Sequence, residues 1–452
     1  MLAPNLKNTG KYRAQRQRSR TELRPANLKD LRKCLDPASN TPLPIRPRGA
    51  GTASTDCNSS SAGTTLRTTG MDRIVRIDAH DCSVTAEAGV PLDALVEALA
   101  GEGFELVGGY ELQGRTVGGA VAAPCFGPCI GHNGSYFSSH VIAIKVVTAD
   151  GRLLNIEPAR KSLLGAFRMS FGLLGVIYEV TLRIRPGRTF SAIHRRVTID
   201  KFAEIVDTLA RSDVGFKFYL MPYRDRVYLD LRRYQIDPGN SRKVPWRIKY
   251  WSESTILPHV VRSLNRVVPI QSVRYNLIDT VSEATQSLVN TRLVTTGSNA
   301  APQSNPGKRG AAQTRFYSTW CFPAANFSMI AKAYQEFCAT IYAESAYRCD
   351  LPAVGYRLCR DTTTPLSPSF DETMIALTTA STQLRGWEDF VIDLAEFAEK
   401  WGGTPLISQS RALRAEYAIQ TYANRLDFFR RTRRQLDPRN RLLSPFLAQF
   451  CQ

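Results

Sequence analysis

Three segments rich in small residues constrain the fold more than any other feature of this chain. They read PRGAGTA at 47–53, TVGGAVAA at 116–123 and FGLLGVIYEV at 171–180. Glycine permits tight and left-handed turns, and it lets successive backbone N–H groups come close to an anion. One such turn alone would indicate only a loop. Two of them, separated by strand and helix patterns and followed by a third that leads into a strand, predict a backbone cradle for a charged ligand.

The stretches between these segments alternate between helix and strand patterns. Residues 90–101 carry leucine and valine at helical spacing, with glycines after the end. The β-rich runs 141–148 and 152–156 are joined by an Asp-Gly turn signal. Residues 175–185 alternate apolar and polar side chains until a proline ends the run. The N-terminal part therefore mixes helices with antiparallel strands.

In their order and spacing these segments resemble the FAD-binding domain of the vanillyl-alcohol oxidase and p-cresol methylhydroxylase (PCMH) family. The likeness covers about residues 15–188 and includes VTADG at 147–151. It implies an α+β fold, in which a two-subdomain PCMH-type FAD-binding domain precedes an α+β substrate or cap domain with an antiparallel sheet. A Rossmann fold is not expected, because no G-x-G-x-x-G follows an opening strand with an acidic residue about 20 positions later.

The resemblance implies FAD as the cofactor. In that family the first segment wraps the pyrophosphate, the second passes along the pyrophosphate and isoalloxazine, and the third makes backbone contacts near the adenine half. Carried over to this sequence, the cofactor-binding residues are Arg48, Gly49, Ala50, Gly51, Thr52, Ala53, Thr116, Val117, Gly118, Gly119, Ala123, Phe126, Gly127, Gly175, Val176 and Ile177.

Non-covalent FAD is predicted, because the two usual histidine tethers are replaced. Thr52 stands where covalent members often carry His, and Phe126 where sugar-lipid members carry His before glycine. Cys125, Cys129 and His132 lie in the stretch expected to face the flavin, so a link through one of them is the alternative. No metal site is expected, since the C-x3-C pair has no further ligands at a suitable spacing.

The C-terminal half is similar to two groups of sugar oxidases. GYR at 355–357 resembles a Glu-x-Arg segment of the alditol and aldonolactone oxidases, and GGTPLISQSR at 402–411 resembles the closing segment of the decaprenylphosphoryl-ribose oxidases. The Glu is replaced by Gly355, and a Lys that both groups place near the flavin is replaced by Gln409. Arg357 would hold an anionic substrate or stabilise charge on reduced flavin. The candidate catalytic residues are Arg357, Gln409 and Tyr356, and for each of them a structural role is favoured over a catalytic one.

The implied activity is oxidation of an alcohol (CH–OH) group by hydride transfer to flavin N5. A sugar, a sugar lactone or a lipid-linked polyprenyl-phosphate sugar would fit as substrate, with oxygen or an electron carrier as acceptor. The alternative is a catalytically weakened flavin-fold protein that docks a membrane or nucleic acid. No nucleic-acid-binding module signature interleaves the basic residues, so no specific nucleic acid is expected.

The sequence divides into four parts. A basic N-terminal tail occupies 1–14, and the FAD-binding domain occupies 15–188. The substrate domain follows at 189–425 and contains a mobile loop near 296–314, where large apolar side chains are almost lacking. The remaining segment, 426–452, is expected to return to the FAD domain.

The net charge indicates which partners the protein favours, and the cysteine content indicates the redox state of its compartment. The net charge is +19, from 59 basic and 40 acidic side chains, which favours anionic partners. The densest group of arginines, between 425 and 441, is interpreted as a solvated basic face. Ten irregularly spaced cysteines indicate a reducing compartment. A cytoplasmic location is expected, with peripheral membrane contact as a further option.

Overall fold

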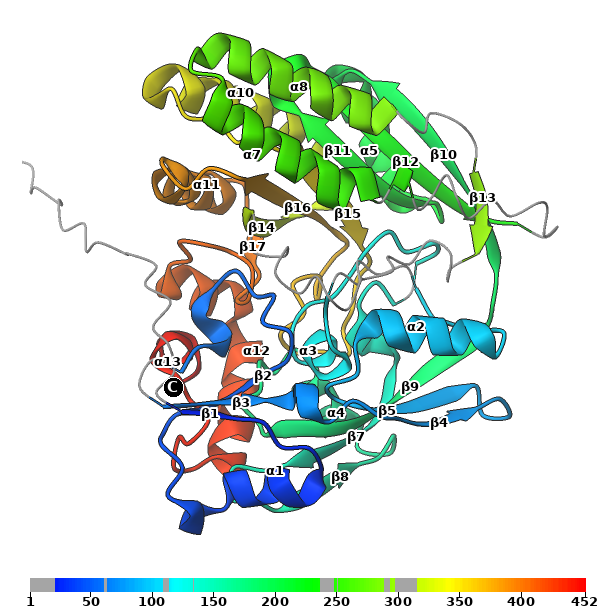
Figure 1. The fold of residues 1–452 in the computed structure, drawn as a ribbon, viewed down its shortest axis with the longest axis vertical. Coiled ribbons are helices and arrows are strands. Elements are labelled where there is room, and N and C mark those ends of the chain that lie inside the picture. Colours follow the sequence, from blue (N-terminus) through cyan, green and yellow to red (C-terminus); the bar gives the residue numbers. More distant parts are fainter. Residues whose placement is uncertain are drawn as a thin grey trace, which may run out of the picture.

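The computed structural model describes residues 21–60, 63–108, 114–132, 134–235, 248–249, 251–287, 293–296 and 315–452. The predicted tail at 1–14 and the predicted loop at 296–314, apart from residue 296, lie outside these residues. The predicted α+β class is confirmed. The N-terminal sheets and the C-terminal helices build one half of the molecule, and a large antiparallel sheet with its helices builds the other (Figure 1).

The N-terminal half contains two sheets. A small parallel sheet has the order β1-β3-β2 and is accompanied by helix α1. An antiparallel sheet has the order β4-β5-β9-β7-β8, and β6 also pairs with β9. These elements are β1 (Thr21–Leu23), α1 (Leu28–Leu35), β2 (Ile45–Arg48), β3 (Thr64–Arg67), β4 (Ile74–Asp78), β5 (Ser83–Glu87), α2 (Leu92–Gly101), β6 (Phe104–Leu106), α3 (Val117–Ala122), β7 (Val141–Val147), β8 (Leu153–Ile156), α4 (Lys161–Phe167) and β9 (Val176–Pro186).

The second half is built on an eight-stranded antiparallel sheet, here called the cap sheet, with the order β13-β10-β12-β11-β15-β16-β14-β17. Its strands are β10 (Thr189–Val197), β11 (Gly215–Met221), β12 (Arg226–Tyr234), β13 (Leu293–Thr296), β14 (Phe316–Pro323), β15 (Ala353–Leu358), β16 (Met374–Ser381) and β17 (Thr404–Pro405). The helices of this part of the chain are α5 (Ile199–Arg211), α7 (Leu257–Val267), α8 (Gln271–Ser287), α10 (Phe327–Ser345), α11 (Trp387–Lys400), α12 (Ala415–Leu436) and α13 (Pro445–Cys451).

The elements expected from local patterns are present. The helix expected at 90–101 is α2, and the run at 175–185 is β9, which includes the terminal proline. Strands β7 and β8 pair antiparallel across the Asp-Gly turn, where Gly151 has φ 82°. This is the left-handed conformation for which the turn signal selects glycine.

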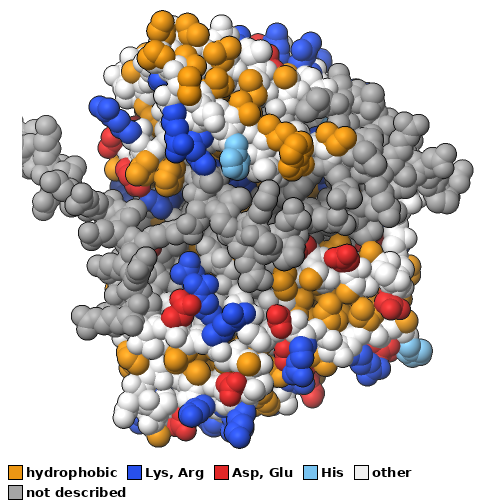
Figure 2. Space-filling view, viewed as in Figure 1, with side chains coloured by type: hydrophobic (Ala, Val, Ile, Leu, Met, Phe, Trp, Pro, Cys, Tyr) orange, Lys and Arg blue, Asp and Glu red, His pale blue; other side chains and the backbone are white. Residues whose placement is uncertain are grey.

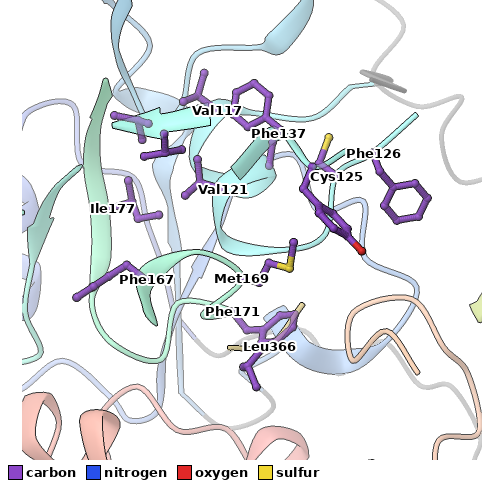
Figure 3. Close-up of a cluster of buried hydrophobic side chains, with 14 of the residues drawn as sticks. Val117, Val121, Cys125, Phe126, Phe137, Phe167, Met169, Phe171, Ile177 and Leu366 are labelled. Atoms are coloured by element: carbon purple, nitrogen blue, oxygen red, sulfur yellow. The ribbon is translucent and has the colours of Figure 1, made fainter. Parts of the chain in front are cut away.

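Two hydrophobic cores give the cap sheet two different faces. One core joins the N-terminal half to α12 and to one face of the cap sheet, and part of it is drawn in Figure 3. The other core joins the opposite face to α5, α10 and α11. On β11, Phe216 and Phe218 enter the core under the helices. Lys217 and Tyr219, which alternate with them, therefore belong to the face toward the N-terminal half.

The arginines between 425 and 441 do not form one solvated face, which corrects that interpretation. Arg433 and Arg441 are buried. Arg433 donates to the carbonyl of Cys451 at 2.8 Å, and Arg441 donates to the carbonyl of Leu35. The amide of Ile45 in turn donates to the carbonyl of Arg441 at 2.8 Å. These side chains join the last segment of the chain to the first.

Candidate functional site

A pocket lies where the three glycine-rich segments meet. The walls come from residues 47–53, 115–123 and 171–177, and the cap half adds Tyr317, Ser408 and Gln409. Segments far apart in the sequence thus form one cavity between the two halves of the molecule.

The glycines in this pocket are required by close packing. A β-carbon at Gly49 would lie 2.2 Å from Oγ1 of Thr116, and one at Gly118 would lie 2.7 Å from the β-carbon of Ala88. Gly51 has φ 73°, a left-handed conformation. Larger side chains would push the first two segments apart or fill the space between them. These glycines let the first and second segments approach each other closely at the pocket.

The polar groups of the pocket suit a large anionic cofactor. Arg48 and Arg115 line it, and Arg115 also donates to the carbonyl of Pro124 at 2.9 Å. The buried hydroxyl of Ser408 has no hydrogen-bond partner among the described residues. Two guanidinium groups, tightly turned backbone and one unsatisfied hydroxyl match the needs of a pyrophosphate joined to a polar ring system.

Most of the predicted cofactor residues line this pocket, and four do not. Those that do are Arg48, Gly49, Ala50, Gly51, Thr52, Ala53, Thr116, Gly118, Gly119, Ala123, Gly175 and Ile177. Val117 and Val176 bury their side chains in the protein core. Phe126 packs edge-on against Tyr136, and Gly127 is not among the lining residues either. Pocket residues that the sequence prediction omitted include Arg115, Tyr317 and Ser408.

Gln409 is the one candidate catalytic residue that lines the pocket. Its buried side chain donates from Nε2 to the carbonyl of Pro124 at 3.0 Å. Its own carbonyl accepts from the amide of Thr319 at 3.2 Å and from the hydroxyl of Ser54 at 2.8 Å. Gln409 therefore links the first glycine segment, the end of the second and strand β14.

Arg357 does not line the pocket and lies on the other face of the cap sheet, so its substrate-side role stays a prediction. Its buried guanidinium donates to the carbonyls of Ser212, Cys129 (3.2 Å) and Gly131 (2.7 Å). Gly355, two residues earlier, faces the ring of Phe218 in the core under the helices. Because side chains alternate along a strand, both residues of the Glu-x-Arg likeness point away from the pocket side.

Tyr356 points to the opposite face from Arg357, the face of the cap sheet toward the N-terminal half. It packs against Phe126 with ring centroids 5.9 Å apart, and the ammonium group of Lys217 lies 5.6 Å from its ring centroid. Tyr356 does not line the FAD pocket itself. It belongs to the cap-sheet surface beside it.

The same surface carries charged residues that the sequence analysis did not select. Strand register places Tyr356 opposite Lys217, Lys217 opposite Asp230, and Asp230 opposite His194. All four are therefore in one row across the sheet. Burial alone would raise the pKa of Asp230, but the neighbouring Arg232 and Lys249 hold that pKa well below its ordinary value. No local motif marks this row, because it is formed only when four strands pair.

The candidate residues for covalent flavin attachment differ in their exposure and contacts. Cys125 is fully buried in the core, and His132 is exposed. Cys129 is buried, and its carbonyl accepts from Arg357. A different thiol, that of Cys57, lines the pocket, and burial raises its pKa, which keeps it protonated. A protonated thiol is a weak nucleophile.

Fold and pocket together define a flavoprotein with a PCMH-type FAD-binding domain. Residues 21–157 match the family model described as an FAD binding domain. Residues 180–450 match the model described as D-arabinono-1,4-lactone oxidase. The second match spans more than half of the sequence, so the chain belongs to the D-arabinono-1,4-lactone oxidase family.

Individual relatives are similar over part of their length. L-gulono-1,4-lactone dehydrogenase of Mycobacterium tuberculosis is 28% identical over 205 residues, which cover 45% of this chain and 47% of the relative. L-gulonolactone oxidase of Bos taurus is 24% identical over 254 residues, which cover 54% and 57%. The chain thus spans about half the length of the curated relatives it matches.

Solved structures share the fold over nearly the whole chain. Cholesterol oxidase from Brevibacterium sterolicum superposes with a TM-score of 0.77 at 14% identity, covering 95% of this chain and 94% of that one. Xylooligosaccharide oxidase from Myceliophthora thermophila gives a TM-score of 0.66 at 13% identity, covering 95% and 92%. At such low identity these likenesses concern the fold alone.

Proposed function

We propose that the protein is an FAD-dependent oxidoreductase that oxidises a CH–OH group of a sugar lactone. The observation that carries this is the meeting of the three glycine segments with Gln409 at the cap sheet. The family match favours an aldonolactone over the other sugar substrates considered from the sequence. Bound FAD would supply the two-electron acceptor. Whether oxygen or a carrier then takes the electrons is left to experiment.

Some of the residues in the pocket would bind the cofactor, and others would position groups at the flavin. Arg48 and Arg115 would balance the pyrophosphate charge, and the segment at 49–53 would follow the cofactor backbone. Gln409 would present its amide at the flavin end, held by Pro124. The row that contains Lys217 lies on the pocket-side face of the cap sheet and could meet the substrate or its leaving proton.

The direct test is anaerobic reduction of the purified holoprotein. D-arabinono-1,4-lactone, L-gulono-1,4-lactone and L-galactono-1,4-lactone would be added separately, and the visible flavin absorbance followed. We expect at least one lactone to bleach the flavin, while the corresponding open-chain acid does not. Readmission of oxygen or of an artificial acceptor then separates oxidase from dehydrogenase. Flavin that dithionite reduces but no lactone does would contradict the proposed substrate class.

Non-covalent FAD binding remains a prediction, motivated by Thr52 and Phe126 and by the protonated thiol of Cys57. Acid precipitation should release the yellow colour into the supernatant. Flavin that stays with the pellet would point to a covalent bond. Peptide mapping would then identify the attachment site, with Cys57, Cys125, Cys129 and His132 as the residues to inspect.

A further prediction concerns the missing cation at Gln409. Gln409→Lys would place an ammonium group in the pocket, where it should stabilise negative charge on the reduced cofactor. We expect the flavin reduction potential to rise by about 30 mV or more, which corresponds to roughly 1.4 kcal/mol for a two-electron couple. Gln409→Met, of similar size and neutral, is the control. A potential unchanged by lysine would show that residue 409 does not influence the flavin.

The alternative, a flavin-fold protein that only docks an anionic partner, predicts a different outcome of the same experiments. Such a protein would bind FAD, and no lactone would reduce it at a rate above that of the free cofactor. The replacement of the Lys by Gln409 favours this alternative, whereas the pocket and the family match oppose it.

A further inference from the structure

Helices α7 and α8 form a hairpin that exposes several large hydrophobic side chains. Nearly half of the large hydrophobic side chains exposed in the described part of the chain lie in or beside this hairpin. Val267 is 76% exposed, Ile270 61% and Trp251 55%. The full set is Ile248, Trp251, Val267, Ile270, Val273 and Leu277, here called the hairpin patch. Figure 2 shows hydrophobic side chains together with Lys and Arg over the end of the molecule that carries α7 and α8.

These exposed side chains are not needed by the core beneath. The inner face of the hairpin already buries Leu257, Val261, Tyr275 and Ile278 against one another. Val273 and Leu277 are four residues apart on the opposite face of α8, and Ile270 immediately precedes this helix. A helix with an apolar stripe on each side has a second surface available for contact.

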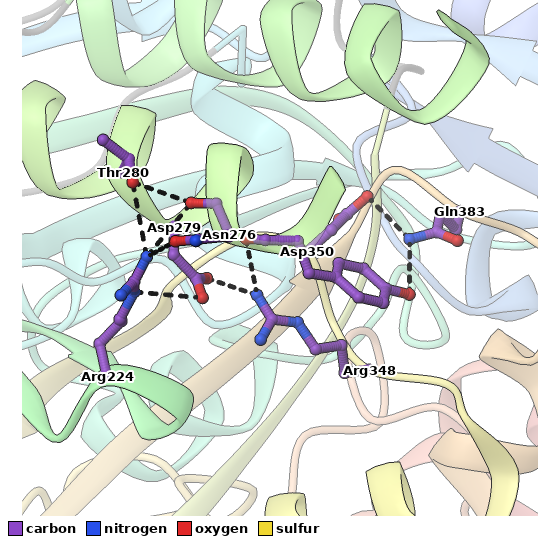
Figure 4. Close-up of polar contacts among 8 residues, drawn as sticks. Arg224, Asn276, Asp279, Thr280, Arg348, Asp350 and Gln383 are labelled. Carbon is purple, nitrogen blue, oxygen red and sulfur yellow. Dashed lines mark hydrogen bonds and ion pairs between the residues drawn. The ribbon is translucent and has the colours of Figure 1, made fainter. Parts of the chain in front are cut away.

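A polar network fixes α8 to the body of the protein and takes up its acidic charge. Arg224 donates to the side chain of Asn276, and Arg348 is ion-paired with Asp279 (Figure 4). Arg224 also approaches Asp279, with Nε at 3.4 Å from the carboxylate. Asp279 is therefore satisfied on the inner side. Figure 4 shows these groups on the side of α8 that faces Arg224 and Arg348.

Basic side chains outnumber acidic ones on the outside of the hairpin, where Glu283 of α8 is partly exposed. Arg266 is exposed beside Val267, and Arg262 and Arg274 are partly exposed on the same hairpin. Glu253 accepts from the hydroxyl of Tyr219 at 2.5 Å, and only 12% of its side chain is exposed. Among the described residues of the hairpin, no acidic side chain belongs to the exposed class. The apolar patch thus has a basic rim.

We propose that the hairpin patch docks on a lipid bilayer that carries anionic headgroups. Its apolar side chains would enter the interface between headgroups and acyl chains, and the arginines would meet the phosphates. The described residues contain no helix long and apolar enough to cross a membrane, so contact here would lie along the surface. A second copy of this chain fits less well, because a two-fold contact through the patch would enclose the arginines of both copies in one interface without matching acidic partners from the patch.

Vesicle co-sedimentation of the full-length holoprotein tests this directly. Wild type should sediment with vesicles of equal parts phosphatidylcholine and phosphatidylglycerol, and more weakly with phosphatidylcholine alone. The triple variant Val267→Ser, Ile270→Ser, Val273→Ser should lower the partition coefficient about tenfold or more. The double variant Arg262→Glu, Arg266→Glu should abolish the preference for the anionic vesicles. Flavin content and melting temperature equal to wild type would verify that each variant is folded.

The matched control replaces three exposed apolar residues of the N-terminal half, by Leu43→Ser, Val75→Ser and Leu153→Ser. It should bind vesicles as wild type does. Wild type that does not sediment, or a control that loses binding as completely as the patch variant, would overturn the proposal. Sedimentation velocity tests whether a second copy of the chain binds the hairpin patch instead. A wild-type dimer that the triple patch variant abolishes would assign the patch to that second copy. None of these outcomes depends on the proposed catalytic activity.

Discussion

Replacing Gly51 by valine is expected to give a folded chain that binds FAD much more weakly than wild type. Gly51 has φ 73°, which a β-branched residue adopts only with strain. A β-carbon there would lie 2.6 Å from the guanidinium nitrogens of Arg48, so the arginine that lines the pocket would have to move. The new side chain would also occupy the cradle. We expect FAD affinity to fall about tenfold or more, roughly 1.4 kcal/mol at least.

The control is Gly103→Val, since Gly103 also has a left-handed backbone, with φ 78°, and no atom within 4 Å of its added β-carbon. It reports the backbone strain alone, about 1–2 kcal/mol of stability. The measurements are the flavin-to-protein absorbance ratio and thermal unfolding of both variants. If Gly51→Val keeps as much flavin as Gly103→Val, then the first glycine segment does not hold the cofactor.

The fold was predictable where local sequence determines local structure. The Asp-Gly turn at 150–151 requires a left-handed glycine, and strand β9 shows its two faces in its alternation. The meeting of the glycine segments at one pocket was also predictable, because the close contacts of Gly49 and Gly118 exclude any larger residue. These features depend on contacts with few other residues, so the local sequence pattern is enough to predict them.

The pocket-side surface of the cap sheet was not predictable in the same way. One row of side chains depends on the pairing of four strands: Tyr356, Lys217, Asp230 and His194. The sequence around each of these residues does not indicate which residues will lie beside it. The position of Arg357 away from the pocket was not predictable for a related reason. A likeness to a short Glu-x-Arg segment gives the strand but not its register, and a shift of one residue moves every side chain to the opposite face.

A structural role for Arg357 leads to the second large expected effect. Arg357→Ala should lower the free energy of unfolding by about 2–4 kcal/mol, because the carbonyls of Ser212, Cys129 and Gly131 would lose a charged donor in a buried place. Since the guanidinium lies on the face away from the pocket, the rate of flavin reduction in the folded holoprotein should stay within about twofold of wild type, roughly 0.4 kcal/mol of barrier.

Arg360→Ala is the matched control, since Arg360 is exposed and donates to one carbonyl, that of Phe370, at 3.3 Å. Its loss should change stability by about 0.5 kcal/mol or less. Denaturant unfolding measures the first effect, and stopped-flow reduction by a turnover lactone measures the second. A structural role and a substrate-binding role of Arg357 predict opposite results. Normal stability with flavin reduction slowed about tenfold would support the substrate-binding role. Lower stability with normal reduction would instead show that it holds the loops around Cys129 and Ser212 against strand β15.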